Sequence, residues 1–238
     1  MKKIFKIERY DANKGESSYY ESFAVEARPD DRILDCLNQI RWSQDPSLAY
    51  RMSCAHGVCG SDGMRIDGVC SIACQRLVKD YEDLDEILIE PLPNFPVLKD
   101  LVVSIDGFFQ KYRSIVPYLR AEEAAPDLER LQSPKERAEF DEAVRCILCA
   151  CCTAACPVGS GNEDFVGPAA LLRSFRFLFD SRDRSDEERL ELADGENHAK
   201  ACKMHQQCSK VCPKEIPVSK SIGRIKRRIY EKKKSKGD

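Results

Sequence analysis

Long apolar runs are missing from this sequence. In its 238 residues, no stretch approaches the roughly 20 consecutive apolar residues that a membrane-spanning helix needs. The first ten residues alternate charged with apolar side chains and include no apolar run that ends in small residues, so we expect neither a secretory signal nor a transit peptide. We therefore expect any membrane contact to come through a partner.

The sequence also lacks an excess of positive charge. Its formal net charge is −2, from 38 lysines and arginines against 40 aspartates and glutamates. Because sequence-independent binding to nucleic acid needs a basic surface, we expect no nucleic-acid partner. Basic residues do gather at the C-terminal end, in residues 220–236. We interpret this end as a solvated tail, with contact to anionic lipid or to an acidic partner as the alternative.

Cysteine, in contrast, is abundant, with 13 residues in the chain. All but Cys36 fall into three groups: Cys54, Cys59, Cys70 and Cys74; Cys146, Cys149, Cys151, Cys152 and Cys156; Cys202, Cys208 and Cys212. A disulfide framework would suit a small exported protein, but the odd number, the absence of an export signal and the length of the chain disfavour it. Metal ligation or redox chemistry is the better explanation. The isolated Cys36 is expected to be a packed core residue.

The first part of the chain predicts a small domain with a sheet. Apolar and aromatic residues suggest strands from Ile4 to Tyr10 and from Tyr20 to Ala27, and a last strand over residues 86–92. Between them, residues 33–40 carry apolar side chains at helical spacing, with Asp30 and Asp31 as candidate caps. We place this first domain at residues 1–98.

The remainder, residues 99–238, predicts a mainly helical domain. Its pattern becomes helical from Lys99, and further helices are expected over residues 135–144 and 168–179. The acidic segment 122–142 between them is interpreted as a solvated face or loop. We therefore expect an α+β protein of two domains.

Two copies of one cysteine motif lie in the second domain. Residues 146–157 match C-x2-C-x2-C-x3-C-P, the pattern of bacterial two-cluster ferredoxins, at every position. Residues 202–213 repeat this spacing, with His205 where the second cysteine belongs. In such pairs the fourth cysteine of each motif ligates the cluster of the other motif.

Because each motif gives its fourth cysteine to the cluster of the other motif, two ligand sets are predicted. One cluster, a [4Fe-4S] cluster, takes Cys146, Cys149, Cys152 and Cys212, and the other takes Cys156, Cys202 and Cys208. Three thiolates suit a [3Fe-4S] cluster, with His205 lying beside it. The alternative is a [4Fe-4S] cluster completed by His205, since histidine ligates iron in some iron–sulfur centres. Cys151 receives no ligand role.

Zinc is the competing metal for these cysteines. Structural zinc sites also use short C-x2-C pairs, but they draw their four ligands from two separated pairs. Two copies of the longer motif, each ending in proline, do not fit that arrangement. The spacing therefore favours iron–sulfur clusters.

A further cluster is predicted in the first domain. The spacing of Cys54 and Cys59 matches the start of the plant-type [2Fe-2S] pattern, C-x4-C-x2-C with a distant fourth cysteine. Asp62 stands at the third position, where its carboxylate can bind ferric iron; the alternative is an ordinary turn residue. The fourth ligand is either Cys70 or Cys74, and spacing leaves both open. Nearby glycines would let the loop wrap closely around the cluster or serve only as loop residues.

A plant-type site followed by two bacterial-type sites resembles the iron–sulfur subunit of succinate dehydrogenases and fumarate reductases. The resemblance covers nearly the whole chain and includes the loop 51–63, the motifs at 146–152 and 212–214, and the segments 167–169 and 176–182. It implies Asp62 as the third ligand of the [2Fe-2S] cluster and Cys74 as the fourth. It also implies a non-cysteine residue at position 205, in agreement with the ligand sets above.

The resemblance further implies the fold, the partners and the function. The fold is a β-grasp [2Fe-2S] ferredoxin-like domain followed by a helical two-cluster ferredoxin-like domain. The chain would relay electrons between the FAD of a flavoprotein subunit and quinone, through [2Fe-2S], [4Fe-4S] and [3Fe-4S] clusters, in a succinate:quinone or quinol:fumarate oxidoreductase. It would have no dicarboxylate site of its own. A cytochrome b anchor subunit would carry any haem, and the chain would lie on the cytoplasmic face of the bacterial plasma membrane.

One departure from the family concerns the quinone. Many ubiquinone-linked relatives carry tryptophan soon after the cysteine-proline at the [3Fe-4S] cluster, whereas the only tryptophan here is Trp42. We therefore transfer no quinone-binding residues, and expect a menaquinone held mainly by the anchor subunit. The competing functions are a relay subunit in a soluble flavoprotein complex, such as a thiol-dependent fumarate reductase, and a zinc module.

Overall fold

A computed structural model describes residues 1–11, 13, 17–121 and 127–237. The chain divides into two compact units. Unit 1 contains residues 1–105 and 147–155, and unit 2 contains residues 106–146 and 156–238. A short piece of the second cysteine group therefore belongs with the N-terminal unit.

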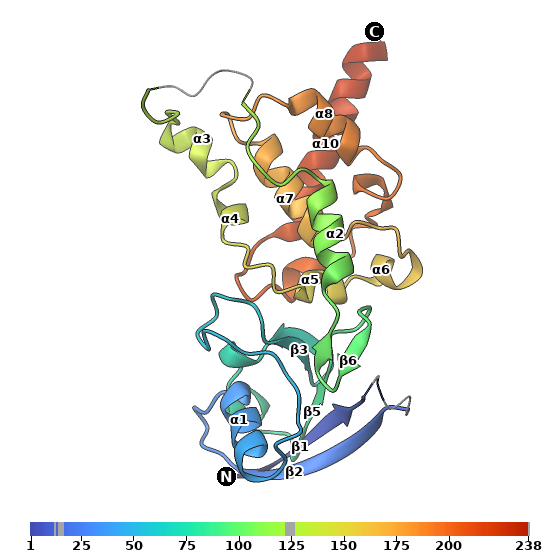
Figure 1. Ribbon diagram of the computed structural model, residues 1–238. Helices are drawn as coiled ribbons and strands as arrows, with labels where there is room; N and C mark the ends of the chain where they lie inside the picture. The colour runs from blue at the N-terminus through green and yellow to red at the C-terminus, as the bar shows by residue number, and fades with distance from the viewer. Residues whose placement is uncertain (12, 14–16, 122–126, 238) are drawn as a thin grey trace. The chain divides into compact units, whose positions relative to one another are not determined.

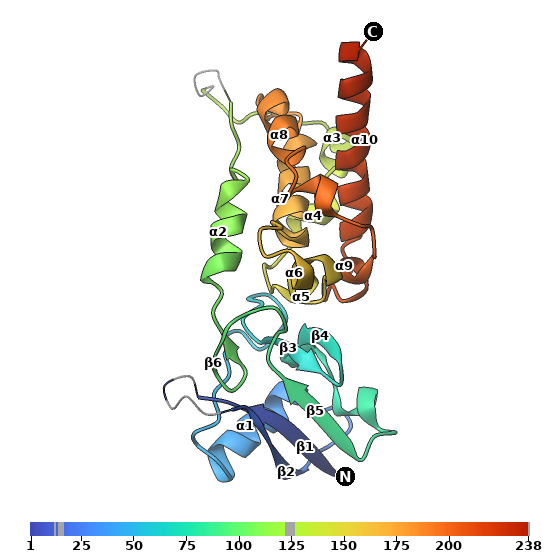
Figure 2. The same ribbon diagram turned by 90° about the vertical axis from the view of Figure 1, so that its right-hand side faces the viewer.

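Unit 1 is built on a mixed five-stranded sheet in the order β2-β1-β5-β3-β4 (Figures 1 and 2). The two long N-terminal strands pair antiparallel, β1 pairs parallel with β5, and β3 pairs antiparallel with both β4 and β5. The strands are β1 (Lys2–Arg9), β2 (Tyr19–Glu26), β3 (Gly63–Ile66), β4 (Val69–Ile72) and β5 (Glu86–Glu90). Alternate residues of β1, including Phe5 and Ile7, are fully buried, as expected for a strand that packs one face on a core.

Helix α1 (Ile33–Ser43) completes the expected β-grasp arrangement. Its Ile33, Leu34, Leu37 and Ile40 are fully buried, so the predicted apolar face is confirmed. The predicted caps are wrong, because the helix starts at Ile33 and its N-cap is Arg32. The Arg32 N–H donates to Asp35 Oδ2 at 3.0 Å, and Asp31 instead accepts from the Arg28 N–H at 2.8 Å. Two short 3-10 turns, η1 (Ala73–Gln75) and η2 (Val78–Tyr81), precede β5.

A second hairpin extends unit 1 beyond the predicted boundary after residue 98. Strands β6 (Val97–Lys99) and β7 (Val102–Val103) pair where we expected the helical part to begin, so β5 is not the last strand. Asp100, at their turn, is buried and accepts from Arg9 Nε at 3.1 Å and from the Ala49 N–H at 2.8 Å. These hydrogen bonds connect the hairpin to the sheet, and the hairpin therefore belongs to unit 1.

The segment 147–155 joins unit 1 through backbone contacts. It contains the single-turn helix α5 (Cys151–Ala154), whose Ala154 carbonyl accepts from Asn94 Nδ2 at 2.8 Å. Leu148 and Ala150 both have positive φ, 54° and 65°, so the chain turns sharply on either side of Cys149. The same segment packs against β4.

Unit 2 is helical and is organised around α7 (Pro168–Leu178), of which nine residues are buried. Helices α2, α4, α8 and α10 all contact it, and Figure 2 shows α7 and α10 side by side. The other helices are α2 (Asp106–Ser114), α3 (Pro134–Ala138), α4 (Asp141–Val144), α6 (Pro157–Gly161), α8 (Asp186–Ala193), η3 (Ala199–Ala201), α9 (Gln207–Lys210) and α10 (Val218–Gly237). The predicted helix over 168–179 is confirmed.

Two other expectations for this unit are wrong. The predicted helix over 135–144 is broken into α3 and α4 around Phe140, whose fully buried ring redirects the chain. The C-terminal end is not a solvated tail but helix α10, with Ile222 and Ile225 fully buried. Its Arg228 donates to the Leu178 carbonyl at 2.5 Å. Of the acidic segment 122–142, residues 122–126 lie outside the described part of the chain.

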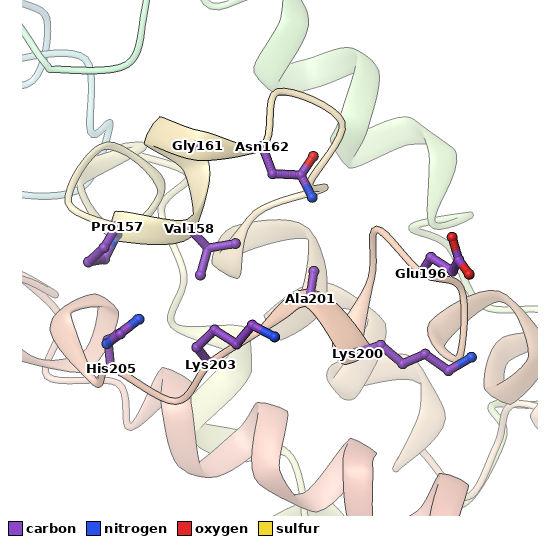
Figure 3. Close-up of a pocket in the computed structure, with 9 residues that line it drawn as sticks. All are labelled: Pro157, Val158, Gly161, Asn162, Glu196, Lys200, Ala201, Lys203 and His205. Atoms are coloured by element: carbon purple, nitrogen blue, oxygen red, sulfur yellow. The ribbon is translucent and has the colours of Figure 1, made fainter.

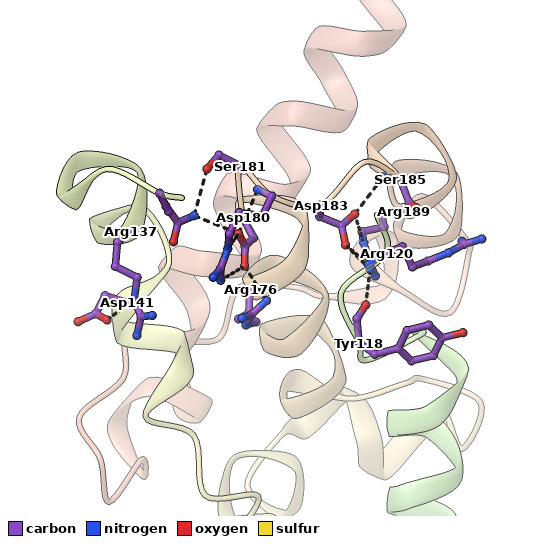
Figure 4. A network of polar contacts seen from close by, with 12 residues as sticks. Tyr118, Arg120, Arg137, Asp141, Arg176, Asp180, Ser181, Asp183, Ser185 and Arg189 are labelled. Carbon is purple, nitrogen blue, oxygen red and sulfur yellow. Dashed lines mark hydrogen bonds and ion pairs between the residues drawn. The ribbon is translucent and has the colours of Figure 1, made fainter. Parts of the chain in front are cut away.

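Buried ion pairs fix the turn between α7 and α8 (Figure 4). The Arg189 guanidinium donates to both carboxylate oxygens of Asp183, at 2.9 and 2.7 Å, and to the carbonyls of Val116 and Tyr118 at 3.0 and 2.7 Å. Both charged side chains are at most 3% exposed. Burial disfavours the charged form of Asp183, but the bonds from Arg189 and from the N–H groups of Arg120 and Ser185 together hold its pKa below the usual value.

A second carboxylate, Asp180, is surrounded in the same way. It accepts from Arg182 at 2.8 and 2.9 Å and from Gln132 Nε2 at 3.0 Å, and it pairs with Arg176 at 2.9 Å. The segment 176–182, one of those that carry the family resemblance, is thus a structural ion-pair network. It fixes the path of the chain between two helices.

Candidate cluster-binding sites

The loop that carries Cys54 and Cys59 directs backbone N–H groups at sulfur. Cys54 Sγ accepts from the N–H of Cys59 at 3.3 Å and from that of His56 at 3.5 Å. These donors lower the pKa of the Cys54 thiol to about 6, first through His56, then through Val58 and Cys59. Cys59 Sγ receives the Ser61 N–H at 3.5 Å. A thiolate held by several N–H donors is ready to bind metal.

Asp62 lies inside the same site. It is 2% exposed, and its Oδ2 accepts the Cys74 N–H at 2.7 Å. Its other carboxylate oxygen, Oδ1, is buried and without a hydrogen-bond partner among the described residues. Because a buried carboxylate oxygen is costly when unsatisfied, this atom fits a metal ligand better than a turn residue.

Cys74 and Cys70 have different surroundings. The pKa of Cys74 is raised to about 12 by burial and then by Asp62, with Cys54 also contributing. The pKa of Cys70 is raised to about 11 by burial, and its charged neighbours are Arg65, Cys149 and Glu90. Cys74 therefore lies with Cys54 and Asp62, whereas Cys70 faces a different part of unit 1.

The second cysteine group has three thiols in unit 1. Cys151 is fully buried, and its Sγ–H donates to the Cys149 carbonyl at 3.8 Å. Cys151 lowers the pKa of the Cys149 thiol by hydrogen bonding, and its own pKa is raised by the same contact and by burial. Cys152 is buried beside them. The unassigned Cys151 is thus a packed thiol next to a predicted ligand.

Three predicted ligands gather in unit 2. Cys156, Cys202 and Cys208 line one small cavity, and His205 lines it too. Burial raises the pKa of Cys208 to about 11, and the charges of Cys156 and Cys202 add to the effect. The sequence-distant Lys226 holds the Cys202 backbone by donating to its carbonyl at 2.6 Å.

The remaining predicted ligands, Cys146 and Cys212, are half-buried thiols of unit 2. Their expected companions Cys149 and Cys152 belong to unit 1. This four-cysteine set therefore remains a prediction from the spacing of the motifs.

An open cavity of about 590 Å³ lies in unit 2, lined in part by Pro157 and by Ala201 and Lys203, the chain neighbours of Cys156 and Cys202 (Figure 3). Lys203 and His205 face Pro157 and Val158 of α6 across it. Its polar lining also includes Asn162, Glu196 and Lys200. The lining is therefore mixed, with mainly apolar residues on the side of α6 and mainly polar or charged residues on the facing loop.

All 13 cysteines are free thiols, so no disulfide framework is present. Within the described ranges, no three His, Cys, Asp or Glu side chains come close enough together to hold one metal ion. None of the helices in the described part of the chain is both long enough and apolar enough to cross a membrane.

Sequence reasoning missed the residues that brace the first loop from a distance. Arg32, the N-cap of α1, donates from Nη1 to the Ala55 carbonyl at 2.6 Å. The Gln75 side chain packs against the backbone of Gly57. Neither Arg32 nor Gln75 belongs to a recognisable sequence motif. Both contacts form only when the chain folds, so the sequence contains no signal for them.

The fold and these thiol sites define an iron–sulfur protein with two ferredoxin-type domains. A family model described as a 2Fe-2S iron-sulfur cluster binding domain matches residues 4–110, and one described as a 4Fe-4S dicluster domain matches residues 142–216. The predicted fold class and the resemblance are thereby confirmed.

Relatives of known name identify the family. The chain is 39% identical to the succinate dehydrogenase iron-sulfur subunit of Coxiella burnetii, over 97% of this chain and 98% of that protein. It is 40% identical to the mitochondrial succinate dehydrogenase [ubiquinone] iron-sulfur subunit 3 of Arabidopsis thaliana, over 95% of this chain and 74% of that protein. The chain belongs to the family of succinate dehydrogenase iron–sulfur subunits.

Solved structures agree with this fold. A chain of the Mycobacterium smegmatis Sdh1 complex in the apo form superposes with a TM-score of 0.89 at 25% identity, covering 98% of this chain and 97% of that chain. A hypothetical protein from Helicobacter pylori shares the fold alone, with a TM-score of 0.60 at 17% identity over 94% of this chain and 39% of that chain.

Proposed function

We propose that this chain is the electron-relay subunit of a membrane-bound succinate:quinone or quinol:fumarate oxidoreductase. It passes electrons between the FAD of a flavoprotein subunit and quinone. The support is the family membership together with the placement of the predicted ligands. The chain itself makes and breaks no substrate bond.

The proposed ligands follow the motif spacing and, for the first cluster, the placement of Asp62. The [2Fe-2S] cluster is held by Cys54, Cys59, Asp62 and Cys74, the [4Fe-4S] cluster by Cys146, Cys149, Cys152 and Cys212, and the [3Fe-4S] cluster by Cys156, Cys202 and Cys208. When bound, the clusters supply one-electron oxidation and reduction.

The observation that carries the proposal is the surroundings of Asp62. Its Oδ1 is buried without a hydrogen-bond partner among the described residues, and its Oδ2 accepts the Cys74 N–H. Neighbouring N–H groups favour the thiolate form of Cys54. These residues supply anionic ligands and hydrogen-bond donors at one place, which is what an iron–sulfur site requires.

His205 is proposed not to ligate iron. It lines the cavity of Cys156, Cys202 and Cys208, and also the larger cavity of Figure 3. The His205 ring can therefore point into the larger cavity and away from the three cysteines. With three thiolates and no fourth ligand, a three-iron cluster is the natural occupant of this site.

The proposed partners are a flavoprotein subunit and a cytochrome b membrane anchor, with menaquinone near the [3Fe-4S] site. The cavity of Figure 3 supports this position for the quinone, because it is a concave surface lined by the chain neighbours of Cys156 and Cys202. We propose the cytoplasmic face of the bacterial plasma membrane as the location.

Co-purification with bound cofactors tests this function. The chain is expressed with its genomic neighbours, a tag on this chain is used for purification, and iron, acid-labile sulfide and FAD are then measured. We expect all three, and we expect succinate to bleach the visible absorption of the sample. A tagged chain that binds zinc, lacks sulfide or gives no response to succinate would refute the proposal.

A further inference from the structure

Two glycines of the first cluster loop lie in unusually close contact with the second cysteine loop. A Cβ atom placed on Gly60 would lie 2.8 Å from the Ile147 carbonyl oxygen and 3.0 Å from both Cα and Cβ of Cys149. Contacts under 3.0 Å are essentially never made by real Cβ atoms, and Gly60 also has φ of +67°. No other residue type can occupy this position without moving the loop.

Gly63 makes the second contact. A Cβ there would lie 2.8 Å from the Cys149 carbonyl oxygen, 3.3 Å from Leu92 Cδ1 and 3.7 Å from Cys151 Sγ. The backbone of Gly63 is not in the positive-φ region. Its lack of a side chain is therefore required by the neighbouring backbone and not by its own conformation.

The loop on the other side of the contact has little freedom to move away. Cys149 stands between two residues with positive φ, Leu148 and Ala150. Beyond them, Cys151 is fully buried, and Asn94 holds the Ala154 carbonyl at 2.8 Å. A methyl group added at either glycine would push against backbone atoms that are fixed from both ends.

The contact also joins predicted ligands of two different clusters. Asp62, proposed for the [2Fe-2S] cluster, stands between Gly60 and Gly63, and Cys149, proposed for the [4Fe-4S] cluster, is the residue that both glycines touch. All of these residues belong to unit 1. The contact is thus a direct backbone approach between the two ligand loops within this unit.

We infer that Gly60 and Gly63 are positioning residues, which set how closely the Cys149 loop approaches the Asp62 loop and so the distance an electron crosses between the first and second clusters. The inference rests on the proposed function. Because electron tunnelling through protein falls steeply with distance, a fold that relays electrons gains from removing side chains between two ligand loops. The glycines contribute by the absence of a side chain and ligate nothing.

The test compares Gly63→Ala with Gly107→Ala in the purified complex. Neither glycine has a positive φ, but a Cβ on Gly107 would meet no atom within 4 Å. Gly60→Ala is compared in the same way with Gly68→Ala, because both glycines have positive φ and a Cβ on Gly68 also meets nothing within 4 Å. Within each pair, a difference between the two variants therefore reports the loss of the close contact, because both variants share the conformational effect of replacing glycine by alanine.

The readout is the EPR power saturation of the [2Fe-2S] signal while the [4Fe-4S] cluster is reduced, with iron and sulfide measured on the same samples. A nearby paramagnetic cluster speeds the relaxation of the first signal, and this effect weakens with distance. In the Gly63→Ala and Gly60→Ala complexes we expect the half-saturation power to fall severalfold relative to their controls. A selective loss of the [4Fe-4S] signal with the [2Fe-2S] signal retained would also support the inference, because the added methyl group would then have displaced Cys149.

Saturation equal to that of the controls would overturn the inference. So would loss of the [2Fe-2S] signal alone, or failure of both contact variants to fold while both controls fold, since the glycines would then serve the fold and not the spacing. Failure of the proposed function gives a different result, because the unaltered chain would then contain no iron and sulfide.

Discussion

Asp62 shows at the scale of one residue how a turn residue is distinguished from a ligand. An aspartate in a Ser-Asp-Gly turn normally satisfies its carboxylate with nearby N–H groups or water. Here one oxygen accepts the Cys74 N–H, and the other is buried without a partner in the described part of the chain. A half-satisfied buried carboxylate is what we expect of the proposed iron ligand.

Replacing Asp62 tests this assignment. Asp62→Leu should lose most of the [2Fe-2S] EPR signal and keep the signals of the other two clusters, because only the first site loses a ligand. Asp62→Cys should keep the first cluster, since thiolate is a better iron ligand than carboxylate. Asp83→Leu, at an exposed aspartate of the same unit, is the control. A full first-cluster signal in the Asp62→Leu complex would show that Asp62 is not a ligand.

His205 is the second residue whose role can be tested directly. If the site of Cys156, Cys202 and Cys208 holds a three-iron cluster because position 205 lacks a thiolate, His205→Cys should supply the fourth ligand. The oxidised-state EPR signal of the three-iron cluster should then disappear, and an additional four-iron signal should appear on reduction. His205→Ala should keep the three-iron signal. Loss of that signal in the alanine variant would instead favour histidine ligation.

The sequence predicts candidate ligands better than it predicts their surroundings. Motif spacing and the family resemblance name every proposed cysteine ligand, because ligand spacing within a loop is a local property of the chain. Spacing alone could not choose between Cys70 and Cys74. In the structure Cys70 lies on strand β4 and Cys74 lies on the turn η1. Spacing also could not reveal the braces from Arg32 and Lys226, which reach their loops from other elements.

At the scale of secondary-structure elements, buried charge organises the helical unit. The Asp183–Arg189 pair ties the start of α8 to the backbone that follows α2, through the carbonyls of Val116 and Tyr118. Removing one member of a buried pair leaves the other charge buried without compensation. The pair is therefore expected to matter far more to stability than the exposed pairs on α8 and α10.

Asp183→Asn should lower the free energy of unfolding by about 3 kcal/mol, the usual cost of breaking a buried pair. Asp186→Asn removes a charge from the more exposed pair with Arg228 and should cost less than about 1 kcal/mol. Urea unfolding of the complete chain, followed by helical circular dichroism at neutral pH, measures both. Equal costs for the two variants would contradict the importance given to the buried pair.

The same pair predicts a dependence of stability on pH. The pKa of Asp183 is lower in the folded chain than its unfolded value of about 3.9, because Arg189 and two backbone N–H groups together outweigh the effect of burial. Its stabilisation is therefore fully present above the unfolded pKa and is lost as the pH falls through the folded pKa. The stability difference between the unaltered chain and Asp183→Asn should shrink as the pH falls from about 6 to about 3. A difference that stays constant over this range would contradict the lowered pKa.

Elements with a strong periodic pattern were predictable, and short ones were not. Strands β1 and β2 and helices α1 and α7 agree with their predicted ranges within a few residues, because their buried positions repeat along the sequence. The β6–β7 hairpin was missed because its strands are too short for alternation to show, and its turn depends on the distant Arg9.

At the scale of the whole molecule, the chain combines two ferredoxin-type domains, and one segment of the second cysteine motif belongs to the first unit. Residues 147–155, from within the second cysteine motif, belong to the N-terminal unit. Sequence reasoning divided the chain once, after residue 98, and could not foresee this placement, because it depends on the close approach of two backbones at Gly60 and Gly63. The placement of residues 147–155 brings ligands of two predicted clusters into one compact unit.

The central claim is that this chain holds three different clusters for electron transfer. Low-temperature EPR of the purified complex, oxidised and then reduced in steps, tests it most directly. We predict a three-iron signal in the oxidised sample, followed on reduction by a [2Fe-2S] signal and, at the lowest potentials, by a [4Fe-4S] signal. A folded complex that gives no EPR signal from iron–sulfur clusters at any potential would contradict the account.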